Sequence, residues 1–202
     1  MGKKWRLTVA GLVVWIAGMA VGQIWLRKYA LTAGPTERAA ASWPKHSQLE
    51  RAEGFTAILF LHPKCPCSQA SLLELDKFMT HAPRSTKAYA VFARPSAWAE
   101  KDVKGSLWKQ ATAFPRVVPV IDEKKREAAQ FGALTSGHFF LYRPDGVLAF
   151  QGGITGSRGD VSDNPGLSSA LALVNHGRVE LRETRVFGCA LYDKSGSIFS
   201  AG

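Results

Sequence analysis

Along this chain, one long apolar segment near the N-terminal end precedes a series of short apolar and amphipathic blocks. Residues 7–26 contain no charged side chain. With a rise of about 1.5 Å per residue, a helix of this length spans about 30 Å, the hydrocarbon thickness of a bilayer. Trp5 and Trp25 stand at its two ends, where interfacial aromatic residues are typical. The pattern predicts a transmembrane helix.

A cleaved signal peptide is the alternative interpretation of this segment. Its apolar core is usually about 7–15 residues long and precedes a small-x-small cleavage site. Here Arg27 and Lys28 intervene and residues 30–33 match such a site poorly, so we favour an uncleaved anchor. A slight excess of positive charge before the segment predicts that residues 30–202 lie outside the cytoplasm. We expect a single-pass protein of the cytoplasmic (inner) membrane, with its soluble domain in a disulfide-permissive compartment such as the periplasm.

Beyond residue 50, strand-like and helix-like blocks follow each other in turn. Short apolar runs predict strands at residues 55–61, 87–93, 116–121, 138–142 and 147–151. Amphipathic or charged blocks predict helices at residues 67–80, 97–112, 123–131 and 165–175. Alternation implies parallel strands with crossover helices, and the Pro144-Asp145-Gly146 turn adds an antiparallel hairpin. The predicted fold class is therefore α/β, with a central mixed sheet flanked by helices.

The same blocks predict four parts of the chain. Residues 1–29 form the transmembrane anchor, and residues 30–50, which contain Gly34, Pro35 and Pro44, form a linker. Residues 51–178 form the folded domain. Residues 179–202 form a short C-terminal extension.

Composition and charge narrow the functions that fit this chain. It is 46% hydrophobic and 21% charged, which is ordinary for a folded protein. The net charge of +10 suggests nucleic-acid binding at first sight. Its distribution argues against that function, because five of the positive charges flank the apolar segment and the others are mixed with acidic residues. The five are Lys3, Lys4, Arg6, Arg27 and Lys28. We therefore expect membrane contact through residues 7–26 and no nucleic-acid partner.

The apolar run at residues 57–61 leads into a turn that carries two of the three cysteines. The turn reads His62-Pro63-Lys64-Cys65-Pro66-Cys67-Ser68, and an amphipathic block follows it. A helix start stabilises a thiolate, because it offers free N–H groups and the positive end of the helix dipole. Lys64 adds a positive charge beside the first cysteine. We therefore expect the thiol pKa to be lowered at this turn.

This arrangement resembles thioredoxins over roughly residues 50–176, in the membrane-anchored form of the TlpA and ResA type. Thioredoxins carry Cys-x-Pro-Cys, so the resemblance implies that Cys65 attacks, Pro66 shapes the turn and Cys67 resolves. One residue is missing between the two cysteines. Thioredoxins also place a cis-proline before the strand of the final hairpin. The matching position falls near Gly137, where no proline stands, and Gly137 and His138 are expected to line the loop that faces the dithiol.

A closer resemblance is to the RedB family of thioredoxin-like proteins, and it covers nearly all of the chain after the anchor. It rests on three segments: the turn at residues 62–68, the glycine-rich residues 152–159, and Val186-Phe187-Gly188-Cys189. The family implies a thioredoxin-like fold and defines little of the reaction.

The first function that fits the cysteine pair is the exchange of thiols and disulfides with protein partners. A Cys65–Cys67 bridge joins residues two apart, so it would be strained, and strain makes a disulfide more oxidising. We expect a membrane-anchored, extracytoplasmic thiol-disulfide oxidoreductase without an organic cofactor. Its electrons would come from another dithiol protein.

The second function is copper binding. Two thiolates and an imidazole are ligands that suit Cu(I) or zinc, and we favour copper over zinc. The ligands would be Cys65, Cys67 and a histidine, either His62 or His138. The Sco proteins use two cysteines and a histidine on a thioredoxin fold, and the resemblance to them is loose. A third alternative is an idle thioredoxin fold that serves as an interaction module.

Three cysteines leave one unpaired in any disulfide scheme, and an alternative pairing joins Cys65 or Cys67 to Cys189. Within an apolar run Cys189 is most simply a core residue, since free cysteine is commonly buried. If the C-terminal extension folds back over the site, Cys189 is instead a resolving cysteine or a third ligand. The polar, glycine-rich residues 152–166, which include Arg158 and Asn164, predict a loop that caps the last helix, or a rim beside the dithiol.

Overall fold

The computed structural model describes residues 2–192, so residues 193–202 of the expected C-terminal extension lie outside the described part. The chain divides into two compact units, Met1–Thr32 and Ala33–Gly202. The first unit is helix α1, Lys3–Leu31. Its stretch Trp5–Leu31 is long and apolar enough to cross a membrane, a property that N-terminal signal sequences share. The predicted apolar helix is confirmed as a candidate membrane span.

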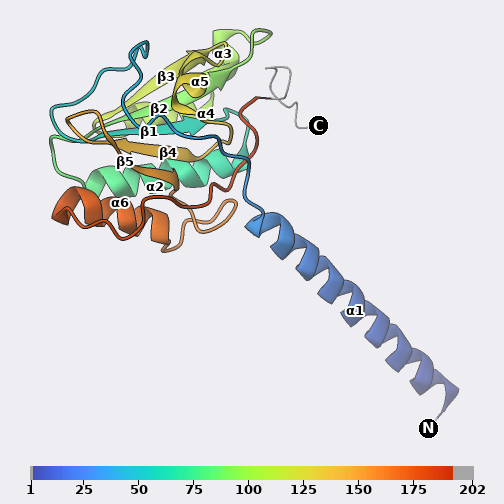
Figure 1. Ribbon diagram of the computed structural model, residues 1–202. Coiled ribbons are helices and arrows are strands. Elements are labelled where there is room, and N and C mark those ends of the chain that lie inside the picture. The colour runs from blue at the N-terminus through green and yellow to red at the C-terminus, as the bar shows by residue number, and fades with distance from the viewer. Residues whose placement is uncertain (1, 193–202) are drawn as a thin grey trace. The chain divides into compact units, whose positions relative to one another are not determined.

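The second unit is built on one five-stranded sheet with the order β3-β2-β1-β4-β5. Strands β1 (Thr56–Leu61), β2 (Lys87–Arg94) and β3 (Val117–Glu123) are parallel to one another. Strand β4 (His138–Tyr142) pairs antiparallel with β1, and β5 (Leu148–Gly153) pairs antiparallel with β4. With its flanking helices this mixed sheet is a thioredoxin-like fold, as the sequence predicts (Figure 1).

Five helices accompany the sheet in the described part of the second unit. They are α2 (Pro66–His81), α3 (Glu100–Val103), α4 (Ser106–Ala113), α5 (Arg126–Phe131) and α6 (Pro165–His176). Helices α2 and α6 lie side by side on one face of the sheet (Figure 1).

Each face of the sheet carries its own apolar layer, because successive strand residues point to opposite faces. Leu59 and Phe139 point into the layer that α2, α4 and α6 cover. Phe60 and Phe140 point into the other layer, which contains the buried side of α5 and Leu49 from the segment before β1. Both faces of β1 are therefore covered, and this strand is buried along its whole length.

Two predicted helices differ from the structure. The helix predicted at residues 97–112 is two helices, α3 and α4, and Gly105 is the N-cap of α4. Glycine interrupts a helix because it loses more conformational entropy there than other residues do. The helix predicted from residue 123 begins at Arg126, after Lys124 and Lys125 adopt left-handed φ angles of 54° and 63°. The carboxylate of Asp122 then accepts the first free N–H groups of α5.

Within the second unit, hydrogen bonds also involve the segment before β1 and the segment after α6. The Tyr142 hydroxyl donates to the carbonyl oxygen of Ala40 at 2.7 Å. The Gly34 N–H donates to the carbonyl oxygen of Val186 at 2.8 Å. These bonds join the segment that follows α1 and the segment that follows α6 to one compact body.

Candidate functional site

Cys65 lies where strand β1 ends and helix α2 begins. It is the N-cap residue of α2, and Pro66 occupies the first helical position. Proline costs no hydrogen bond there, because a backbone N–H at this position has no partner within the helix. Two serines fix the end of β1: the His62 N–H faces Ser68 Oγ at 3.2 Å and Ser136 Oγ at 3.0 Å. The Ser68 hydroxyl donates back to the His62 carbonyl oxygen at 2.9 Å. The turn before Cys65 is therefore held from α2 and from the loop before β4.

Cys189 meets Cys65 although the two residues are 124 positions apart in the chain, and their sulfur atoms lie 2.8 Å apart. Cys189 belongs to residues 186–192, which we name the C-terminal strap. The strap pairs with the loop before β4, where the Ser136 N–H donates to the Cys189 carbonyl oxygen at 2.8 Å. This pairing places the third thiol at the start of α2.

The surroundings of Cys65 stabilise its thiolate. Hydrogen bonding with the Cys189 thiol is the largest cause that lowers the pKa of Cys65, and the backbone N–H groups of Cys189, Cys67 and Ser68 act in the same direction. Burial opposes them, yet the pKa of Cys65 falls to about 5. The pKa of Cys189 is raised, first by the bond to Cys65 and then by burial. At neutral pH this pair therefore consists of one thiolate and one thiol.

Cys67, in the first turn of α2, lies beside Arg158. Burial, and then the charge of Cys65 and hydrogen bonding with it, raise the pKa of the Cys67 thiol, whereas the charge and hydrogen bonding of Arg158 lower it. The Arg158 Nη1 also donates to the carbonyl oxygen of Gly188 at 2.5 Å. Arg158 therefore connects the start of α2 with the C-terminal strap, which places the loop after β5 beside the cysteines.

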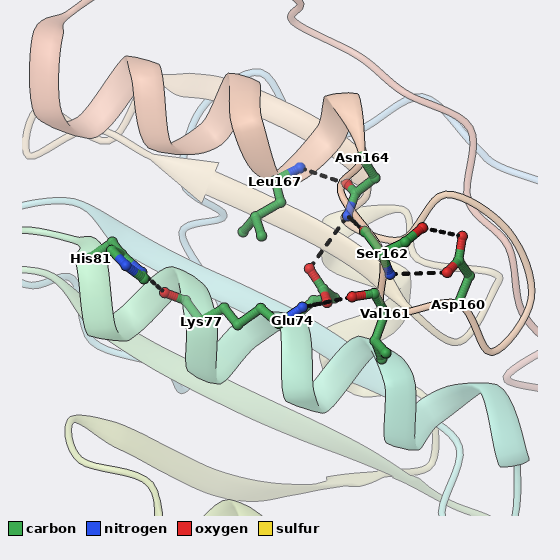
Figure 2. Close-up of polar contacts among 8 residues, drawn as sticks. All are labelled: Glu74, Lys77, His81, Asp160, Val161, Ser162, Asn164 and Leu167. Carbon is green, nitrogen blue, oxygen red and sulfur yellow. Dashed lines mark hydrogen bonds and ion pairs between the residues drawn. The ribbon is translucent and has the colours of Figure 1, made fainter.

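A fully buried carboxylate, Glu74, ties the loop that carries Arg158 to helix α2 (Figure 2). Glu74 Oε1 accepts from Lys77 Nζ at 2.6 Å, and Oε2 accepts from Asn164 Nδ2 at 3.3 Å. Lys77 Nζ also donates to the Val161 carbonyl oxygen at 2.7 Å. Asn164 caps α6 with its side-chain oxygen, so its predicted capping role is confirmed.

Near Cys65, the His62 ring lies edge-on to Trp98, with 6.1 Å between the ring centroids. His62 Nδ1 accepts from the Lys64 N–H at 3.2 Å, and its Nε2 is buried with no hydrogen-bond partner in the described residues. Burial lowers the pKa of His62, whereas the charge of Cys65 raises it. Lys64 Nζ stands 4.3 Å from the Trp98 ring centroid. A cationic and aromatic surface therefore borders the thiolate.

The other expected site residues are Pro66, Lys64, Gly137 and His138, and the structure does not bring all of them to Cys65. Pro66 and Lys64 are exposed beside Cys65. Gly137 has a φ of 88°, and a β-carbon there would come 2.7 Å from Ser71 Oγ of α2, so this position requires glycine. The His138 ring stacks on Phe140 with 4.1 Å between centroids. It therefore lies in the apolar layer on the face opposite α2.

The copper site stays a prediction of the sequence. Within residues 2–192, no group of three or more histidine, cysteine, aspartate or glutamate side chains is arranged to hold a metal ion. His62 lies near Cys65, but its Nδ1 is engaged by a backbone N–H. His138 lies in the opposite core layer.

Sequence reasoning missed two residues that shape this site, Glu74 and Trp98. Glu74 lies four residues after Ala70 and four before Phe78, on the face of α2 that is buried. The sequence did contain a signal for Glu74, because it is a charged residue on the apolar face of an amphipathic helix. Trp98 falls within the helix predicted at residues 97–112, whereas it lies in the loop before α3.

No protein-family model matches the chain, and no curated protein sequence matches it significantly. Solved structures are similar to it. An uncharacterized conserved protein from Geobacillus kaustophilus is 17% identical, with a TM-score of 0.57, over 85% of this chain and 94% of that chain. A hypothetical protein from Sinorhizobium meliloti 1021 is 19% identical, with a TM-score of 0.56, over 80% of this chain and 94% of that chain.

A secreted disulfide oxidoreductase from Mycobacterium tuberculosis is 16% identical, with a TM-score of 0.45, over 60% of this chain and 83% of that chain. At such identities the similarities concern the fold alone.

Proposed function

We propose that this protein exchanges thiols and disulfides with protein partners and that Cys65 is the attacking thiol. The observation that carries the proposal is the 2.8 Å contact between the sulfur of Cys65, whose pKa is about 5, and a second thiol that stays protonated. Thiolate is the reactive form, and a second thiol is needed to release the mixed disulfide. Both requirements are met at the start of α2.

The low pKa of Cys65 supports a direction for the exchange. A thiolate of low pKa is a good leaving group, and its stability favours the reduced form of the pair. A disulfide that includes Cys65 is therefore easily reduced. This supports a protein that donates or rearranges disulfides in its partners, rather than a strong reductant.

The apolar helix α1 supports an anchored protein whose second unit works outside the cytoplasm, where disulfides persist. The three segments that resemble the RedB family, residues 62–68, 152–159 and 186–189, meet around Cys65 through the contacts of Cys189 and Arg158. That convergence supports a RedB-like member of the membrane-anchored thioredoxin-like proteins.

The test uses the full-length protein in detergent micelles with a fluorogenic peptide disulfide as the probe. We expect exchange at neutral pH that Cys65→Ala abolishes. Ser168→Ala changes an exposed residue of α6 and serves as the matched control, with exchange unchanged. Exchange that survives in Cys65→Ala would contradict the proposal. So would copper bound in equal amount to the protein, lost in Cys65→Ala, with no exchange in the wild type.

A further inference from the structure

Two cysteines compete as the redox partner of Cys65. Cys67 is close in sequence, and its thiol interacts with both Cys65 and Arg158, but a bridge between residues two apart would be strained. The Cys189 sulfur lies 2.8 Å from that of Cys65. A disulfide bond is about 2.05 Å long, so this second pair needs only a small closing movement. The geometry favours the cysteine that is distant in sequence.

We propose that Cys189 is the resolving cysteine of Cys65, so that the oxidised protein carries a Cys65–Cys189 disulfide and Cys67 keeps its thiol. This inference rests on the proposed function and supplies its second thiol from the C-terminal strap.

The strap holds Cys189 in place from both ends. At one end Val186 is fully buried, and its carbonyl oxygen accepts the Gly34 N–H at 2.8 Å. At the other end the Tyr192 hydroxyl donates to Asp122 Oδ2 at 3.0 Å. A segment anchored on both sides of a single thiol presents that thiol to Cys65 at a fixed position.

Close backbone contact brings the strap to this position. An antiparallel bridge joins Thr135 to Ala190, and the Leu191 N–H donates to the carbonyl oxygen of residue 134 at 2.8 Å. A β-carbon at Gly188 would overlap the carbonyl oxygen of Ser136, so a larger residue would push the strap away. The glycine before Cys189 is therefore a requirement of the contact between the two sulfurs.

The exchange proceeds in two steps. The Cys65 thiolate attacks one sulfur of a partner's disulfide, which forms a mixed disulfide and expels the partner's other sulfur as a thiolate. Cys189 then loses its proton to solvent and attacks the Cys65 sulfur, which forms the Cys65–Cys189 bond and releases the partner's second thiolate. The partner gains two electrons and its thiolates take up protons, while the two cysteines of this chain lose two electrons. A dithiol protein reverses the steps.

The strap also controls access to the reactive sulfur. Cys65 is 3% exposed, whereas Cys189 is half-buried. A partner's disulfide therefore reaches Cys65 when the strap lifts. In the reduced protein, hydrogen bonds and buried side chains hold the strap. A segment held in this way opens locally at a lower free-energy cost than global unfolding. The Cys65–Cys189 bond fixes the strap in the oxidised protein.

In the test, the reduced full-length protein is oxidised with glutathione disulfide and its remaining free thiols are trapped. Its disulfide bridges are then mapped by mass spectrometry. We expect a bridge between Cys65 and Cys189 in the wild type and in Cys67→Ala. We expect Cys189→Ser to accumulate glutathione on Cys65, with a lifetime about tenfold longer or more, because no fixed thiol displaces it.

The outcomes separate this inference from the proposed function. A Cys65–Cys67 bridge that forms in Cys189→Ser as fast as the wild-type bridge overturns the inference and leaves thiol exchange standing. Loss of the bridge in Cys67→Ala also overturns it, since that variant changes no residue of the strap. If Cys65 of the wild type forms neither an adduct nor a bridge, the proposed function itself fails.

Discussion

Arg158 Nη1 donates a hydrogen bond to the carbonyl oxygen of Gly188 at 2.5 Å and so joins the loop after β5 to the residue before Cys189. The same loop is joined to helix α2 by Glu74, Lys77 and Asn164. A continuous set of polar contacts therefore runs from the middle of α2 to the strap. The position of Cys189 depends on groups well removed from the sulfur atoms.

Cys189 should control the acidity of Cys65. In the reduced Cys67→Ala protein, the thiolate absorbance of Cys65 should rise as the pH increases through about 5, since its pKa is lowered to that value. Adding Cys189→Ala removes the largest cause of the lowering, so the titration should move to higher pH. Ultraviolet absorbance measured against pH checks both expectations. An unmoved titration would show that the helix start alone sets the acidity.

Gly188→Ala should displace the strap. The new β-carbon overlaps the Ser136 carbonyl oxygen, and a backbone overlap of this kind costs about 1–3 kcal/mol of the free energy of unfolding. Alkylation of Cys65 should become faster, because Cys189 no longer covers it. Gly105→Ala is the matched control, since nothing lies within 4 Å of a β-carbon there. Equal alkylation rates in the two variants would argue against a covering strap.

Glu74→Leu should destabilise the protein by about 1–3 kcal/mol, because it leaves Asn164 Nδ2 without its carboxylate partner in a buried position. Lys77 is 48% exposed at its side chain and can turn to water, which limits the loss. Glu74→Gln keeps an acceptor oxygen and should cost less. Urea unfolding measures the differences, with the exposed Glu53→Gln as the control. A loss in Glu53→Gln as large as that in Glu74→Leu would contradict this account.

His138 should make the protein sensitive to acid. Burial lowers the pKa of His138 to about 3, against 6.5 for the free side chain. The unfolded chain therefore binds the proton first, and stability is lost as the pH falls from about 6.5 to about 3, with a slope of up to about 1.4 kcal/mol per pH unit. His138→Leu should remove this part of the slope in urea unfolding at several pH values. The exposed His46→Gln should retain it.

Local signals in the sequence were enough to predict most of the fold. The apolar run at Thr56–Leu61 forms a strand that pairs parallel with β2, and the Pro-Asp-Gly turn joins the antiparallel strands β4 and β5, both as expected. Gly132 and Gly177 end α5 and α6 with left-handed φ angles, as helix-ending glycines do. These features depend on residues near one another in the chain, so their patterns can be read directly.

The site was harder to predict because its decisive contacts join distant residues. No local pattern relates Cys65 to Cys189, and the contact depends on a strap without regular secondary structure. One signal was available for His138. It alternates with Phe140 and Tyr142 along β4, so the three share a face, and that face belongs to the layer away from α2.

The separation of 124 positions between Cys65 and Cys189 also orders the maturation of the protein. A chain that leaves the ribosome N-terminus first contains β1, α2 and the pair Cys65 and Cys67 long before it contains residue 189. During that interval Cys67 is the one neighbouring thiol within the nascent chain. Docking of the strap is therefore the last step of biosynthesis at this site, and it turns an open thiol into a covered thiolate.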